Sequence, residues 1–162
     1  MEVCMLIQLK EAKLSDLLSI YLIQKAAFKS LFLRYQDGET SPYLQSFEKL
    51  NAKFSASNTT YYLIMTAQKT VGFLKLTVEQ EHTTKLSSIA LLPSYENRGI
   101  GRQAMTLIER NVQTDTIHLN TILQEPKLVH FYHSLGYSQT GRFQSTSSAI
   151  CFVSFTKKIA AK

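Results

Sequence analysis

The sequence predicts a single domain of the α/β (α+β) class, built on a mostly antiparallel sheet with helices packed against it. The chain has 162 residues, of which 44% are hydrophobic and 19% charged, and this suits one globular domain over residues 1–162. Three segments rich in β-branched and aromatic residues follow one another between positions 59 and 93, with no room for a crossover helix between them. A loop with two glycines then joins the last segment to a helical pattern.

The first third of the chain predicts one strand and two helices. The apolar segment 3–9 suits a strand. Apolar residues recur at helical spacing over 15–33, which predicts a long first helix. Ser41 can cap a second helix, and Pro42 can open it, because proline is tolerated in the first turn. We expect this second helix to reach Phe54.

The middle of the chain predicts an antiparallel meander. Segments 59–67 and 70–79 are separated by a short polar connection, which indicates a hairpin. Segment 85–93 is the third strand, and Pro93 ends it because proline cannot donate to the ladder. The helix predicted over 101–113 places its apolar side chains on one face, against the sheet.

Composition and charge limit the class of partner. The net charge of +6 favours an anionic partner, but lysine and arginine are scattered and do not interleave with aromatic residues, so we expect no nucleic-acid surface. No apolar run reaches the length of a membrane span, and the N-terminus lacks the pattern of a signal peptide, so we expect no membrane partner and a cytoplasmic location. Cys4 and Cys151 lack metal-ligand spacing, which predicts reduced thiols and no metal site.

The loop at 95–105, "YENRGIGRQAM", predicts a phosphate site. The first N–H groups of a helix have no intrahelical partner, and the helix dipole adds positive potential there. Gly99 and Gly101 let the backbone approach an anion closely, while Arg98 and Arg102 flank it with positive charge. The loop is neither GxxxxGK[ST] nor GxGxxG, so the common nucleotide folds are disfavoured.

Two motifs resemble those of the Gcn5-related N-acetyltransferase (GNAT) family. "LLPSYENRGIGRQAMTLIE" is similar to the family's acetyl-CoA pyrophosphate loop, Q/R-x-x-G-x-G/A, although Glu96 stands where Gln or Arg is usual. "FYHSLGY" at 131–137 is similar to the family's FYxxxGF. The resemblance covers nearly the whole chain, with closing strands expected near 136–143 and 149–156. It implies a mixed, mostly antiparallel sheet of about seven strands, flanked by about four helices and splayed at the cofactor site.

The resemblance also implies a site for acetyl-CoA. A backbone N–H of Leu91 would polarise the thioester carbonyl as an oxyanion donor. Tyr132 would act as general acid, protonating the departing thiolate. The implied cofactor contacts are Ala90, Leu91, Leu92, Asn97, Arg98, Gly99, Ile100, Gly101, Arg102, Phe131 and Tyr132.

The general base and the acceptor site are less clearly marked in the sequence. Ser87 and Ser88 occupy the stretch of strand where family members often place a glutamate. Glu79, Glu81 and His82 are the titratable candidates just upstream of that stretch. We take Glu81 as the expected base, with deprotonation through water as an equal alternative. By resemblance, Phe28, Tyr35 and Asp37 would wall the acceptor groove.

The function implied is acetyl transfer from acetyl-CoA to a primary amine of a small molecule or peptide. The amine would attack directly in a ternary complex, because no cysteine is placed to form a covalent intermediate. The alternative is a non-catalytic acyl-CoA-binding module of the same fold, which the missing strand glutamate favours. The resemblance permits a homodimer, since dimers are common among such folds.

Overall fold

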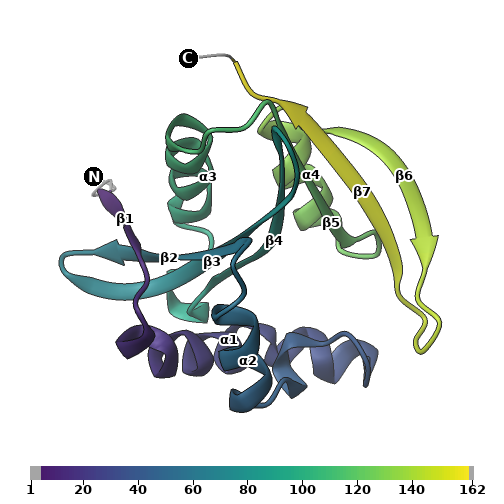
Figure 1. The fold of residues 1–162 in the computed structure, drawn as a ribbon. Coiled ribbons are helices and arrows are strands. Elements are labelled where there is room, and N and C mark those ends of the chain that lie inside the picture. Colours follow the sequence, from purple (N-terminus) through teal and green to yellow (C-terminus); the bar gives the residue numbers. More distant parts are fainter. Residues whose placement is uncertain (1–4, 161–162) are drawn as a thin grey trace.

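The computed structural model describes residues 5–160, so Cys4 and the first two residues of the predicted 3–9 strand lie outside it (Figure 1). Three short 3-10 turns accompany the helices and strands, at Leu14–Asp16, Pro42–Leu44 and Pro93–Tyr95. The main elements in chain order are β1 (Ile7–Glu11), α1 (Leu17–Tyr35), α2 (Phe47–Phe54), β2 (Thr59–Thr66), β3 (Lys69–Gln80), β4 (Thr83–Leu91), α3 (Ile100–Asn111), β5 (Thr116–Ile122), α4 (Pro126–Ser134), β6 (Ser138–Gln144) and β7 (Cys151–Lys158).

The seven strands form one sheet in the order β1-β2-β3-β4-β5-β7-β6. Every neighbouring pair is antiparallel except β4 and β5, which are parallel. Figure 1 shows α1 and α2 on one face of the sheet and α3 on the other, with α4 beside β5. The mixed, mostly antiparallel sheet with four α-helices over the described residues confirms the predicted fold class.

Alternating side chains of the sheet build a core on each face. Leu63, Phe73 and Ala90 pack with the buried side of α1 and with Leu50 of α2. A larger cluster on the opposite face joins strand residues to Ile100, Ala104, Met105 and Ile108 of α3 and to Tyr132 and Tyr137. The period-2 alternation along the strands therefore supplies both helical layers with an apolar surface.

The predicted start of the second helix was wrong. Ser41 does cap a turn that opens at Pro42, but this is the 3-10 turn Pro42–Leu44, and Gln45 is extended. α2 begins at Phe47, where the Ser46 hydroxyl accepts a hydrogen bond from the Lys49 N–H. The reason is tertiary, since α1 side chains donate to the carbonyl groups of Pro42, Tyr43 and Gln45, which a continuous helix would use internally.

Candidate active site

The strands β4 and β5 separate part of the way along the sheet. They pair only where Thr83–Lys85 lies beside Thr116–His118. Beyond that point β4 stays paired with β3 as far as Leu91, and β5 stays paired with β7 as far as Ile122, so a gap opens between them. The splay that the family resemblance implied is therefore present in the sheet.

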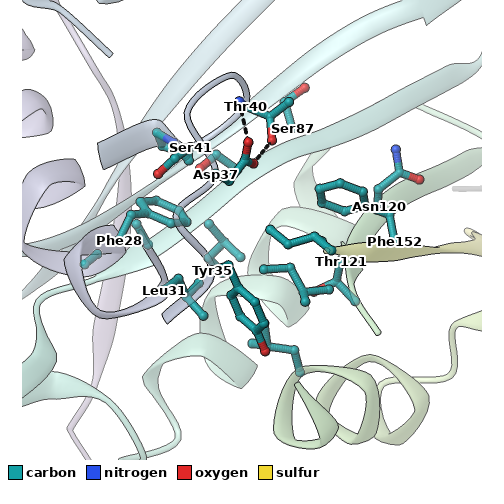
Figure 2. Close-up of a pocket in the computed structure, with 18 of the residues that line it drawn as sticks. Phe28, Leu31, Tyr35, Asp37, Thr40, Ser41, Ser87, Asn120, Thr121 and Phe152 are labelled. Carbon is teal, nitrogen blue, oxygen red and sulfur yellow. Dashed lines mark hydrogen bonds between the residues drawn. The ribbon is translucent and has the colours of Figure 1, made fainter. Parts of the chain in front are cut away.

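A cavity of about 570 Å³ occupies this gap and extends under α1. Figure 2 shows Phe28, Leu31 and Tyr35 of α1 on one side of it, with Asn120, Thr121 and Phe152 of β5 and β7 on the other. The cavity is lined by Ala27, Phe28, Leu31, Phe32, Tyr35, Asp37, Thr40, Ser41, Pro42, Lys85, Leu86, Ser87, Ser88, Ile89, Ala90, Leu91, Glu96, Asn120, Thr121, Ile122, Leu128, Tyr132, Phe143, Ile150 and Phe152.

The end of β4 turns a backbone donor toward the gap. The Leu92 N–H donates to the carbonyl oxygen of Val71, on the β3 side, at 2.8 Å. Because successive residues of a strand direct their N–H groups to opposite sides, the Leu91 N–H faces away from β3 and toward the departed β5. An extended ligand in the gap can therefore pair with β4 as an added strand would.

Tyr132 brings a hydroxyl to the same cavity from α4. Its side chain is only 6% exposed and packs against Phe131, Tyr137 and Phe155. The hydroxyl makes no hydrogen bond within residues 5–160, so it is free for a ligand. Burial raises the pKa of Tyr132 above the usual tyrosine value, so the hydroxyl keeps its proton at neutral pH.

The loop before α3 has the backbone conformation of an anion cradle. Asn97 and Gly99 are left-handed, with φ of 57° and 76°, and Gly99 is the N-cap of α3. This conformation leaves the first N–H groups of the helix, beginning at Ile100, without intrahelical partners. A Cβ at Gly101 would lie 3.4 Å from Phe131 Cζ, so this glycine lets α4 pack closely against the start of α3.

The two arginines that flank this loop contact neighbouring side chains. The Arg98 guanidinium lies over the Tyr95 ring, 5.7 Å from its centroid. Arg102 donates to the Ser134 hydroxyl at 2.6 Å. Glu96 lines the cavity, and burial raises its pKa, although Lys127 acts in the opposite direction. The backbone donors therefore fit a pyrophosphate, whereas the carboxylate of Glu96 does not favour it.

Two of the three expected acceptor residues line the cavity with side chains that a ligand can meet. Phe28 contributes an apolar wall from α1. The Tyr35 hydroxyl donates to Glu125 Oε1 at 2.7 Å, and Arg34 pairs with the same carboxylate. Tyr35 is therefore held in place by the residue that precedes α4.

Asp37 lies at the cavity but organises its own loop. Its carboxylate accepts hydrogen bonds from the N–H groups of Glu39 and Thr40 and from the hydroxyls of Thr40 and Ser147. Figure 2 shows the two hydrogen bonds from Thr40. Burial would raise the pKa of this carboxyl, but those hydrogen bonds outweigh it and lower the pKa. Asp37 consequently holds the loop after α1 in shape, with its acceptor positions already occupied.

The structure does not bring Glu81 to the cavity. It lies in the turn between β3 and β4, where 90% of its side chain is exposed and its nearest ionic partner is His82. A strand rises roughly 3.3 Å per residue, so the ten residues from Glu81 to Leu91 place it about 30 Å from the end of β4. Glu81 is close in sequence to the start of β4, but the cavity lies toward the end of that strand, and the sequence does not show which end of β4 reaches the site.

Sequence reasoning missed the far wall of the cavity. It is lined by Asn120 and Thr121 of β5, by Phe143 of β6 and Phe152 of β7, and by Ile150 immediately before β7. A signal was present in β5, where polar His118 and Asn120 alternate with buried Ile117, Leu119 and Thr121. That alternation marks one face of the strand as uncovered by helices.

Comparison with known proteins agrees with the fold. The chain matches the family described as Acetyltransferase (GNAT) domain over residues 33–159. This span is most of the chain, and the chain belongs to the GNAT family of acetyltransferases.

A curated relative and two solved structures illustrate the likeness. An uncharacterized N-acetyltransferase, ycf52, of Gracilaria tenuistipitata var. liui is 24% identical over 67 residues, which is 41% of this chain and 37% of that protein. This chain therefore matches well under two thirds of that relative's length. Spermidine N-acetyltransferase from Vibrio cholerae, in complex with CoA and spermine, has a TM-score of 0.72 at 19% identity, covering 94% of this chain and 95% of that one.

The ribosomal-protein-S18-alanine N-acetyltransferase from Escherichia coli has a TM-score of 0.74 at 17% identity, with 97% of this chain and 96% of that chain covered. At such identities these structures share the fold. In residues 5–160, no helix combines the length and apolar character needed to cross a membrane.

Proposed function

We propose that this protein transfers the acetyl group of acetyl-CoA to a primary amine of a small molecule or peptide. One observation carries the proposal: the gap between β4 and β5 presents the Leu91 N–H and the Tyr132 hydroxyl to one cavity. The chain belongs to a family of acetyltransferases, and two neighbours of the same fold are named for amine acceptors, spermidine and a protein alanine. The proposal includes a cytoplasmic location and permits a homodimer.

Two groups of residues bind acetyl-CoA, one at the start of α3 and one along β4. The first-turn N–H groups of α3, from Gly99 to Arg102, bind the pyrophosphate, with Asn97 and Arg98 beside them. Ala90, Leu91 and Leu92 bind the extended arm along β4, and Phe131 packs at the start of α3. When bound, acetyl-CoA supplies an activated acetyl thioester.

The chemistry of the transfer follows from these positions. The Leu91 N–H donates to the thioester carbonyl oxygen and stabilises the negative charge that develops there. As the amine nitrogen bonds to the acetyl carbon and the carbon–sulfur bond breaks, Tyr132 donates its proton to the departing sulfur, and the proton that the nitrogen loses on becoming an amide restores the Tyr132 hydroxyl. A primary amine with a pKa of about 10.4 must first lose a proton to attack.

That proton leaves to water in this proposal. Within the described chain, the carboxylates that line the cavity are Asp37 and Glu96. Asp37 already accepts four hydrogen bonds, and Glu96 belongs to the loop before α3. The direct route through a ternary complex needs no further residue.

Ser87 and Ser88 line the cavity on β4, and neither can act as a general base. Their presence favours a second function, a non-catalytic acyl-CoA-binding module. Both functions predict that acetyl-CoA stabilises the protein, and only the first predicts release of the CoA thiol in the presence of amines. Thermal unfolding with acetyl-CoA, NADH and GTP tests the shared part. At 100 times its dissociation constant a ligand adds about 2.7 kcal/mol, which raises the midpoint by about 5–10 °C.

Thiol release with a panel of primary amines then separates the two functions. A shift with acetyl-CoA alone, followed by amine-dependent thiol release, supports acetyl transfer. A shift without thiol release for any amine supports the binding module. Equal shifts with all three ligands contradict both, since they reduce the loop at 95–105 to an unspecific anion site.

A further inference from the structure

A second cavity of about 590 Å³ lies beside the first and shares part of its lining. The shared residues are Thr40, Ser41, Pro42, Ser87 and Ser88. The rest of the lining comes from α1, α2, β2, β3 and the loop after α1. A ligand that passes Ser88 can therefore occupy both cavities.

The second cavity is rich in positive charge. Lys49 and Lys53 reach it from α2, and Lys75 reaches it from β3, against the single carboxylate of Glu39 in its lining. None of the three lysine side chains forms an ion pair within residues 5–160. Lys75 instead lies over the Tyr61 ring, 5.6 Å from its centroid.

Lys75 is the most strongly constrained of these lysines. Its side chain is half-buried between Tyr61 and Ser88, the residue opposite it on β4. Burial lowers the pKa of Lys75, and the charges of Lys53 and Lys85 lower it further. Such an ammonium group gains more from a bound anion than an exposed lysine does, because it has lost part of its hydration.

Ser88 provides an independent sign that the junction of the two cavities binds a polar group. Its Oγ is buried and has no hydrogen-bond partner within the described chain. An unsatisfied buried hydroxyl is destabilising, because it has lost its hydrogen bonds to water. Its position at the junction of the two cavities means that a polar atom of a ligand spanning them would satisfy it.

The carboxylates nearby offer little to a polycation. Asp37 is filled by hydrogen bonds within its loop. Glu125 pairs with Arg34 and accepts from Tyr35, and Glu79 lies 2.7 Å from His118 Nε2. Glu39 is the exception, since its carboxylate lines the second cavity and has no ion pair within residues 5–160, but it faces three lysines that are also without an ion pair.

We propose that the acceptor is an amine that also carries an acidic group, a carboxylate or a phosphate, with the amine in the first cavity and the acidic group bound by Lys75 and Lys53 in the second. This inference rests on the proposed function for the role of the amine, and on the second cavity alone for the acidic group. It distinguishes the acceptor from the polyamine named for one structural neighbour.

Calorimetric binding to the full chain, with and without coenzyme A, tests the inference. The probes are L-phenylalanine against L-phenylalaninamide, phosphoethanolamine against ethanolamine, and spermidine. We expect at least one acid-bearing probe to bind tenfold or more tightly than its neutral partner. The pair that shows the difference identifies the acid as carboxylate or phosphate.

Variants assign that difference to the second cavity. Lys75→Gln should remove tenfold or more of the affinity for the acid-bearing probe, and the exposed Lys53→Gln should weaken it without risk to folding. Lys75→Arg should retain binding, and Lys10→Gln, an exposed lysine on β1, is the matched control and should change nothing. Equal binding of the paired probes, no binding of any probe, tighter binding of spermidine, or unchanged affinity in the Lys75→Gln and Lys53→Gln proteins would overturn the inference.

The outcome also separates this inference from the proposed function. Acid-selective binding without thiol release contradicts acetyl transfer and leaves the anion site standing. Thiol release with neutral amines or spermidine as efficient as with acid-bearing amines contradicts the anion site and leaves acetyl transfer standing.

Discussion

The Tyr35 hydroxyl donates a 2.7 Å hydrogen bond to Glu125 Oε1, which joins the last residue of α1 to the residue before α4. The Glu125 side chain is only 16% exposed and also pairs with Arg34. Both helices line the first cavity, α1 through Phe28 and α4 through Tyr132. This contact therefore fixes the spacing between the α1 wall and the α4 wall of the cavity.

Tyr35→Phe should weaken the protein and its acceptor site together. Losing one hydrogen bond costs about 1 kcal/mol, which lowers the midpoint of thermal unfolding by about 2–4 °C. We expect a higher KM for the acceptor with kcat little changed, because the wall loosens while Tyr132 stays in place. Tyr62→Phe is the control, since the Tyr62 hydroxyl makes no hydrogen bond in the described chain. Unchanged midpoint and KM would contradict the role given to this contact.

Tyr132→Phe should abolish most turnover while sparing cofactor binding. A general acid contributes about 10²–10⁴ in rate, so kcat should fall by that factor, whereas the acetyl-CoA dissociation constant should change less than about threefold. Single-turnover kinetics and calorimetry measure the two quantities. Tyr137→Phe is the comparison, because that buried hydroxyl is bound to Glu109 and its loss should lower stability without removing the acid. If Tyr132→Phe kept full activity, another group would have to protonate the departing thiolate, and the role proposed for Tyr132 would be wrong.

Gly99→Ala should strain the loop before α3. A left-handed backbone costs an L-residue about 1–2 kcal/mol, although a Cβ at Gly99 would meet no atom within 4 Å. We expect the unfolding midpoint to fall by about 2–8 °C and acetyl-CoA binding to weaken, since the cap that sets the first N–H groups of the helix shifts. Gly38→Ala is the matched control, because its Cβ is equally unobstructed and its φ is not left-handed. The same loss in both variants would show that backbone conformation is not the cause.

Stability should fall steeply in alkaline solution. Burial raises the pKa of Tyr61 to about 12, whereas an unfolded tyrosine titrates near about 10. Between these values the unfolded chain releases a proton that the folded chain retains, so the free energy of unfolding decreases as pH rises. The slope for this one residue approaches about 1.4 kcal/mol per pH unit.

Burial raises the pKa values of Tyr132 and Tyr137 as well, so the decrease should begin near the unfolded tyrosine pKa and be fully absent below it. Denaturant unfolding from pH 8 to pH 11 measures it, with Tyr61→Phe expected to show a shallower slope. Equal slopes for the two proteins would indicate that the pKa of Tyr61 is the same in the folded and unfolded chains, which would contradict the prediction.

Local sequence patterns predicted the helices and strands well where tertiary packing favours the same structure as the local residue preferences. The strands predicted over 59–67, 70–79 and 85–93 are observed as β2, β3 and β4, because their β-branched and aromatic residues pack on both faces of the sheet. The first strand and first helix shifted by a few residues, to Ile7–Glu11 and Leu17–Tyr35, as did the helix predicted over 101–113, observed at Ile100–Asn111. Such shifts reflect fraying and capping at element ends.

The sequence by itself determined the family and the parts of the site that lie in one continuous stretch. The loop around Gly99 is such a part, since its left-handed glycine and the helix that follows are encoded by neighbouring residues. Tyr132 was accessible in the same way, through the motif at 131–137. In both cases the chemistry depends on local backbone geometry, which short-range sequence specifies.

Only the tertiary structure decided how distant residues meet. In the folded chain, Asp37 accepts hydrogen bonds from its own loop and from Ser147. Glu81 lies in the turn before β4, at the end of that strand away from the cavity. The tertiary structure also assembled Lys53 of α2, Lys75 of β3 and Ser88 of β4 around one cavity. Charge and hydrogen-bond satisfaction depend on distance in space, and packing of α1 and α2 on the sheet sets those distances.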